Sequence, residues 1–166
     1  RVGKGLLLAQ LKQFDEAVTT LESVLGDASF NIKSDIQSQL AGVYVEKGDF
    51  ENSLNYINEA IERNKSSNNY RYQKATIFMK MNEHEKAITI FNDLLEVNEW
   101  NDAALLNRAE SYLTTKKYNQ ARADYLKLQS LRPDNPQIYL RFAQIAKAQN
   151  KPQEEQEVNN DILDAL

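Results

Sequence analysis

Apolar residues recur along the chain at the three- and four-residue spacing of amphipathic helices, and the pattern breaks at regular intervals. Between Tyr44 and Asn64, two apolar runs flank a Lys-Gly-Asp break. Related stretches begin at Phe78 and again at Tyr112, so the same interval separates Tyr44, Phe78 and Tyr112. The pattern therefore predicts pairs of helices of roughly a dozen residues each, with a tight turn inside every pair.

Small residues occupy equivalent positions in both helices of each predicted pair. The first residue after each turn is equivalent too, and these residues are Phe14, Phe50, His84 and Tyr118, with the first interval slightly longer than the others. Small side chains let two helices approach closely, and one such pair cannot bury its apolar face alone, so we expect neighbouring pairs to stack. The two small-residue sets are Gly5, Ala41, Ala75 and Ala109, and Ala17, Ser53, Ala87 and Ala121.

This pattern resembles the tetratricopeptide repeat (TPR), a helix-turn-helix unit of about 34 residues, and the resemblance covers nearly the whole chain. It implies an all-α fold, a right-handed α-α superhelix of about four to five units with a C-terminal capping helix. We expect a single solenoid over residues 1–166, its first unit truncated at the start and its last degenerate. The expected units are about 1–33, 34–67, 68–101, 102–135 and 136–166.

Three local features refine this expectation. The two extra residues of the first repeat predict a longer first connection, with Gly26 as a helix stop and Ser34 as the next N-cap. Pro136 and Pro152 fit first helical turns. The final segment predicts a capping helix with Glu154, Glu155 and Glu157 in its first turn and an apolar stripe of Val158, Ile162, Leu163 and Leu166.

Composition narrows the classes of partner. The sequence has no cysteine, which excludes disulfides and Cys-ligated metals and fits a soluble protein of either the cytoplasm or the periplasm. The net charge of −4 divides into −4 over residues 1–99 (11 Lys+Arg, 15 Asp+Glu), +4 over 100–150 (8, 4) and −4 over 151–166 (1, 5). Without a dense basic stripe we expect no nucleic acid partner, and without a long apolar run no membrane insertion. The abundance of Asn, Lys, Ile and Tyr is similar to that of bacterial proteins from AT-rich genomes.

No combination of residues in the sequence matches a catalytic or metal site, so we expect no catalytic residue, no metal and no cofactor. His84 is the only imidazole, and its place in the repeat favours a structural role. The glutamates of the last segment are favoured as a solvated helix face. Trp100, the only tryptophan, is either a binding hot spot or, as we favour, a packing contact with the next repeat.

The resemblance also implies where a ligand binds, because in the TPR family the first helices line a groove for an extended peptide or a partner helix. Some members clamp a terminal carboxylate there, and Asn107 and Arg141 match two of the five clamp positions, too few to favour that ligand. Asn107 also belongs to a repeat variant that predicts a structural pair between Arg108 and Asp124. The groove candidates are Gln39, Gly42, Tyr72, Gln73, Thr76, Met79, Leu106, Asn107, Glu110, Arg141, Gln144 and Lys147.

Three functional hypotheses stay open from the sequence. The first is a non-enzymatic module that binds an extended or helical segment of another protein in this groove, with the partner unknown. The second is a structural spacer within a longer TPR solenoid, and the third is an accessory domain of a larger enzyme or sensor. The polar Gln, Asn and Thr residues on the expected groove favour the first.

Overall fold

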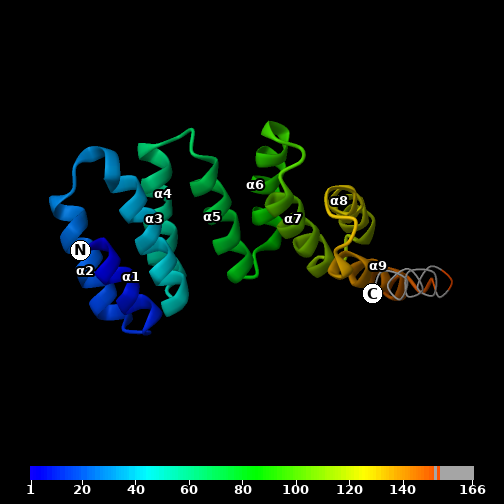
Figure 1. Ribbon diagram of the computed structural model, residues 1–166, viewed down its shortest axis with the longest axis horizontal. Coiled ribbons are helices and arrows are strands. Elements are labelled where there is room, and N and C mark those ends of the chain that lie inside the picture. Colours follow the sequence, from blue (N-terminus) through cyan, green and yellow to red (C-terminus); the bar gives the residue numbers. More distant parts are fainter. Residues whose placement is uncertain (152, 154–166) are drawn as a thin grey trace. The chain divides into compact units, whose positions relative to one another are not determined.

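The computed structural model describes residues 1–151 and 153, with the backbone alone at 30 and 31. Within the described residues the chain forms helices and turns and no strand (Figure 1). The helices are α1 (Val2–Gln10), α2 (Phe14–Asp27), α3 (Phe30–Lys47), α4 (Phe50–Arg63), α5 (Asn68–Lys80), α6 (His84–Val97), α7 (Asp102–Thr114), α8 (Tyr118–Leu131) and α9 (Pro136–Ala148). The expected all-α helical-repeat fold class is confirmed.

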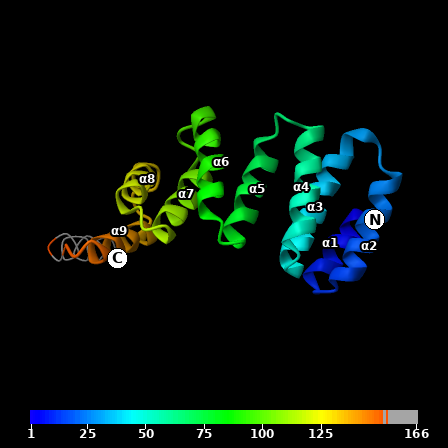
Figure 2. The same cartoon turned by 180° about the vertical axis from the view of Figure 1, so that it is seen from behind.

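The helices gather into two compact units, Arg1–Glu83 and His84–Leu166. In the first unit α1 packs on α2, α2 on α3, α3 on α4 and α4 on α5, and α1 and α5 also contact α3. In the second unit α7 packs on both α6 and α8, and α8 packs on α9. Figure 2 shows the same packing from behind, with α3 beside α4 and α6 beside α7.

Members of the small-residue sets lie where α1 packs on α2, α3 on α4 and α7 on α8. Ala41, Ala75 and Ala109 are fully buried, and so are all four members of the second set. Gly5 is buried too, and a Cβ there would lie 2.7 Å from Leu21 Cγ. At Ser53, where the repeat usually has alanine, the hydroxyl donates to the Ala41 carbonyl oxygen at 2.8 Å. The close approach that the sequence predicts is therefore present in these three pairs.

The turn after each first helix has one conformation throughout. Its central residue adopts a left-handed φ of 60° at Lys12, 83° at Gly48, 62° at Asn82, 58° at Lys116 and 57° at Asn150. The next residue donates its N–H to a carbonyl five residues back, as Asp49 does to Tyr44 at 2.9 Å and Lys117 to Tyr112 at 2.8 Å. This is the Schellman ending of a helix, and its recurrence along the chain follows the period of the sequence pattern.

The first connection corrects two expectations. Helix α2 continues through Gly26 to Asp27, and α3 begins at Phe30, so Ser34 is buried inside α3 and caps nothing. No residue between 30 and 33 disfavours a helix, so the extra residues lengthen α3 to 18 residues in place of the connection. The proline at 136 does lie in the first turn of α9, whereas the expected capping helix lies outside the described residues.

Candidate functional site

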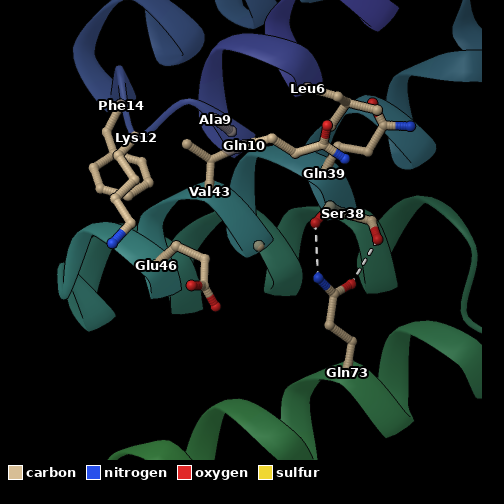
Figure 3. A pocket seen from close by; sticks show the side chains of 11 residues that line it. Leu6, Ala9, Gln10, Lys12, Phe14, Ser38, Gln39, Val43, Glu46 and Gln73 are labelled. Carbon is tan, nitrogen blue, oxygen red and sulfur yellow. Dashed lines mark hydrogen bonds between the residues drawn. The ribbon is translucent and has the colours of Figure 1, made fainter.

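A cavity of about 880 Å³ opens in the first unit, where α1 and α5 meet the middle of α3 (Figure 3). Its lining alternates apolar side chains with amides and includes one residue of each charge. Three smaller cavities, of about 250 to 340 Å³, lie elsewhere among the described residues. The lining residues are Leu6, Ala9, Gln10, Lys12, Phe14, Ser38, Gln39, Gly42, Val43, Glu46 and Gln73.

One wall of the cavity is fixed by a pair of hydrogen bonds between α3 and α5. The Gln73 amide nitrogen donates to the Ser38 carbonyl oxygen at 2.8 Å, and the Ser38 hydroxyl donates to Gln73 Oε1 at 2.5 Å (Figure 3). The Gln73 amide thus has both its oxygen and its nitrogen bonded within the protein. These two bonds fix the position of the Gln73 side chain in the cavity wall.

The remaining polar groups of the lining are not paired in this way. Gln39 Oε1 is buried and accepts no hydrogen bond within the described chain. Lys12, from the turn after α1, and Glu46, from the last part of α3, lie toward the same end of the cavity (Figure 3), and neither makes an ion pair among the described residues. A buried carbonyl oxygen without a donor is unfavourable by about 1–3 kcal/mol.

Gly42 leaves the middle of the cavity wall without a side chain. A Cβ at this position would find a single neighbour, Gln73 Nε2 at 3.7 Å, which is ordinary contact. The backbone there is helical, and the positive φ in this part of the chain belongs to Gly48, which follows the last residue of α3. Packing and backbone geometry therefore both admit a side chain at Gly42.

Three candidates in the second unit, Glu110, Arg141 and Gln144, bond to one another. Arg141 Nε lies 2.9 Å from Glu110 Oε1, and its Nη1 donates to Gln144 Oε1 at 3.0 Å. Glu110 also accepts a 2.7 Å hydrogen bond from the hydroxyl of the fully buried Tyr125. Burial and then this bond raise the pKa of Tyr125. With its guanidinium beside Glu110, Arg141 offers a free carboxylate less attraction than an unpaired arginine would.

Three candidates on α5 lie outside the cavity lining. Tyr72, Thr76 and Met79 are half-buried, and none of them borders the cavity. The Thr76 hydroxyl donates to the Gln73 carbonyl oxygen of its own helix at 2.7 Å. Of the candidates on this helix, only Gln73 therefore contributes to the site.

The last three candidates lie in the second unit. Leu106 is 45% exposed on α7 and borders a smaller cavity of about 250 Å³, while Lys147 is exposed near the end of α9. Asn107 is half-buried, and its amide nitrogen donates to the Ala103 carbonyl oxygen at 3.1 Å. Since the candidates belong to two different units, a single groove joining all of them stays a prediction.

Sequence reasoning missed the α1 side of the cavity. Treating the first unit as truncated left its helix out of the projected groove, although the repeat period identifies it. Leu6 and Gln10 occupy the repeat positions that Gly42 and Glu46 occupy in the second unit. Lys12 also lacks a predicted role, because a turn residue that lines a cavity has no signal in the helical pattern.

His84 and Trp100 differ in how far they are buried. His84 is half-buried, with Nδ1 3.3 Å from the hydroxyl of the fully buried Ser111, which accords with a structural role. Trp100 does not enter a core: it is 48% exposed, and its contact with the following repeat is the Lys127 ammonium, 5.5 Å from the ring centroid. Among the described residues no group of three His, Cys, Asp or Glu residues is placed to hold a metal ion.

The expected pair between Arg108 and Asp124 is confirmed. Arg108 Nε and Nη2 donate to the two carboxylate oxygens of Asp124 at 2.8 and 2.6 Å, and Nη1 donates to Asn92 at 2.8 Å. The hydrogen bonds to Asp124 raise the pKa of the Arg108 guanidinium above its ordinary value. The arginine thus bonds α7 to both α6 and α8.

Family models match the chain in two places. Residues 72–136 match a tetratricopeptide repeat model, and residues 10–94 match the model of anaphase-promoting complex, cyclosome, subunit 3. The chain belongs to the tetratricopeptide repeat family. Proteins of this family are generally non-enzymatic, and this TPR chain is a protein-interaction module.

Individual proteins are similar over different extents. A DnaJ homolog subfamily C member 3 homolog from Dictyostelium discoideum is 31% identical over 104 residues, which are 60% of this chain but 21% of that protein. A TPR protein from Parabacteroides merdae has a TM-score of 0.86 at 18% identity. The match covers 98% of this chain and 64% of the Parabacteroides protein. YrrB, a TPR protein with an unusual peptide-binding site, has a TM-score of 0.75 at 13% identity, with 99% of this chain and 84% of YrrB covered.

No helix in the described part of the TPR chain is long and apolar enough to cross a membrane.

Proposed function

We propose that this TPR chain is a non-enzymatic module that binds an extended segment of a partner protein, and that the cavity between α1, α3 and α5 is its primary site. The observation that carries the proposal is the cavity itself, about 880 Å³ with an apolar floor and a buried, unpartnered acceptor at Gln39. Small-molecule and peptide sites share this composition, mostly apolar with a few polar groups that fix orientation. The peptide-binding site of YrrB, a protein of the same fold, adds support.

A matched pair of glycine variants tests the proposal. Gly42→Arg places a long side chain in the cavity, whereas Gly26→Arg makes the same change on α2, where a Cβ meets nothing within 4 Å. A random peptide library is displayed and selected on the wild-type protein, after circular dichroism and thermal unfolding have shown that both variants are folded. We expect the selected peptides to bind wild type and Gly26→Arg equally and to lose binding to Gly42→Arg.

Two results would contradict the proposal. One is the absence of any enriched peptide, and the other is enrichment of peptides that bind Gly42→Arg as well as wild type. Either result transfers support to the spacer hypothesis, in which the chain's contacts are with further repeats.

We further propose that the polar residues of the second unit bind another part of the same ligand. Arg141→Ala tests this extension, because it removes a predicted groove residue without touching the cavity. A longer selected peptide is expected to bind Arg141→Ala more weakly, whereas the same peptide trimmed to its cavity-binding core is expected to bind both proteins alike. If the long peptide also binds both alike, the ligand does not reach α9.

A further inference from the structure

Two hydrogen-bond acceptors lie along the cavity face of α3 with a gap between them. Gln39 and Glu46 both line the cavity, and seven residues of helix separate them by about 10 Å along the helix axis. Gly42 and Val43 fill the interval on the same face. A ligand lying along α3 therefore meets an acceptor, an apolar stretch that is bare at its centre, and a second acceptor that carries a negative charge.

The two acceptors differ in exposure and in charge. The Gln39 oxygen is buried and has no donor, while the Glu46 carboxylate is exposed and makes no ion pair among the described residues. Lys12, the only other charged residue of the lining, lies on the side formed by the turn after α1. A cation of a ligand is thus favoured at the Glu46 carboxylate, and a carbonyl oxygen of the ligand is favoured at the Lys12 ammonium.

Resting on the function proposed above, we propose that the cavity selects an extended peptide segment with an arginine or lysine. The apolar stem of the basic side chain crosses Gly42, its cation pairs with Glu46, and a backbone N–H of the segment approaches the Gln39 side chain. Extended chain advances about 3.3 Å per residue, so about three residues cover the interval between the two acceptors. Long basic side chains commonly bury the stem along apolar surface and keep the charge at the rim.

The glycine at position 42 is the second observation that supports this ligand. Glycine inside a helix is less favourable than alanine by about 0.5–1 kcal/mol, and nothing in the fold requires it here, because a Cβ fits at ordinary contact distance. A residue that lowers stability without a packing reason is expected at a functional position. Gly42 gives the ligand stem direct access to the α3 backbone.

The experiment uses a peptide from the library selection, synthesised with blocked ends, and measures its Kd by fluorescence anisotropy. We expect one position of the selected peptides to be enriched in arginine and lysine. Replacing that residue by glutamine, or Glu46 by glutamine, should each weaken binding about three- to five-fold, as for an exposed ion pair. The two changes together should weaken binding no more than either one does.

Two further variants separate this ligand from other occupants. Glu46→Lys should bind the basic peptide at least about ten-fold more weakly, and a peptide with glutamate in place of the basic residue should recover part of the loss. Gly42→Ala should unfold at a higher temperature than wild type yet bind the peptide more weakly. Gly26→Ala is the matched control, expected to leave the Kd unchanged.

The outcomes that overturn this inference differ from those that overturn the proposed function. Selected peptides that need an open Gly42 but are acidic or uncharged, or that bind Glu46→Gln and wild type equally, refute the basic ligand and leave the peptide site standing. Binding that is unaffected by Gly42→Ala refutes the role of the glycine. Failure of every peptide to discriminate Gly42→Arg overturns both proposals together.

Discussion

Replacing Asp124 by asparagine removes the charge from a carboxylate that is only 5% exposed while leaving its shape nearly unchanged. The Arg108 side chain opposite is 19% exposed, so the substitution leaves a largely buried guanidinium without its counter-ion. Removing one partner from a buried pair is destabilising by about 3–5 kcal/mol, and the remaining bond to Asn92 and the partial exposure of Arg108 place the expected loss near the lower end.

The structure offers an exposed comparison pair in the same unit. Lys117 and Glu85 approach to 2.8 Å, but their side chains are 39% and 62% exposed, so Glu85→Gln should lower the free energy of unfolding by less than about 1 kcal/mol. The contrast in burial, at similar geometry, accounts for the difference. High salt should weaken the contribution of the exposed pair and leave that of the buried pair nearly unchanged.

Urea unfolding followed by circular dichroism measures both effects, with the m value checked because repeat arrays can lose two-state cooperativity. The decisive quantity is the coupling energy of the cycle formed by Arg108→Met, Asp124→Leu and the double variant. We expect about 2 kcal/mol or more, since two apolar side chains can replace a buried ion pair but one cannot. A coupling energy within about 0.5 kcal/mol of zero would show that the pair does not act as a unit.

Local geometry supports three other predictions. Gly5→Ala should lower stability by about 1–3 kcal/mol, because its Cβ would stand 2.7 Å from Leu21 Cγ, whereas Gly3→Ala meets nothing within 4 Å; equal melting temperatures would contradict the close approach. Lys116→Gly should raise the free energy of unfolding by about 0.5–1 kcal/mol, because glycine adopts a φ of 58° without strain, and Gly48→Ala should lower it by a similar amount. The midpoints of urea unfolding measure both changes, and a lower midpoint for Lys116→Gly would refute the reasoning. Burial, followed by the hydrogen bond to Asp35, raises the pKa of Tyr70 to about 12. The stabilisation that Tyr70 gives the folded state is therefore complete below the unfolded pKa of about 10 and disappears as the pH rises toward 12. Tyr70→Phe should make the free energy of unfolding fall less steeply with pH over that window, and equal slopes for variant and wild type would contradict this.

The repeat, its helix pairs and its turns could be predicted because each depends on local pattern. Small residues at a fixed period mark helix contacts, and the sets containing Ala41 and Ala17 are buried as that logic requires. The ion pair between Arg108 and Asp124 could also be predicted from the sequence, because the two residues belong to a known repeat variant in which they lie on adjacent helices. In each case sequence separation alone determines which faces meet.

Features that depend on competition between alternatives could not be predicted in the same way. A serine at position 34 is a good N-cap, but Ser29 lies where the chain first turns helical, and the absence of a breaker between them decides for the longer helix. The partner of Arg141 depends on the approach of α7 and α9 around Tyr125, which the repeat pattern does not specify. The cavity similarly depends on α1, whose contribution the incomplete first unit concealed.

In the turn after α1, the side chain of Lys12 determines the charge at the cavity, whereas main-chain hydrogen bonds hold the turn in place. Lys12 reaches the cavity wall from a backbone held by main-chain bonds alone, its N–H donating to Ala9 at 2.9 Å and that of Gln13 donating to Leu8 at 2.9 Å. Its side chain is exposed and belongs to no core cluster of the described residues. A single codon change at this position can therefore reverse the charge that a ligand meets while the helices keep their places, which makes the turn a natural point for related copies of the protein to diverge in the partners they choose.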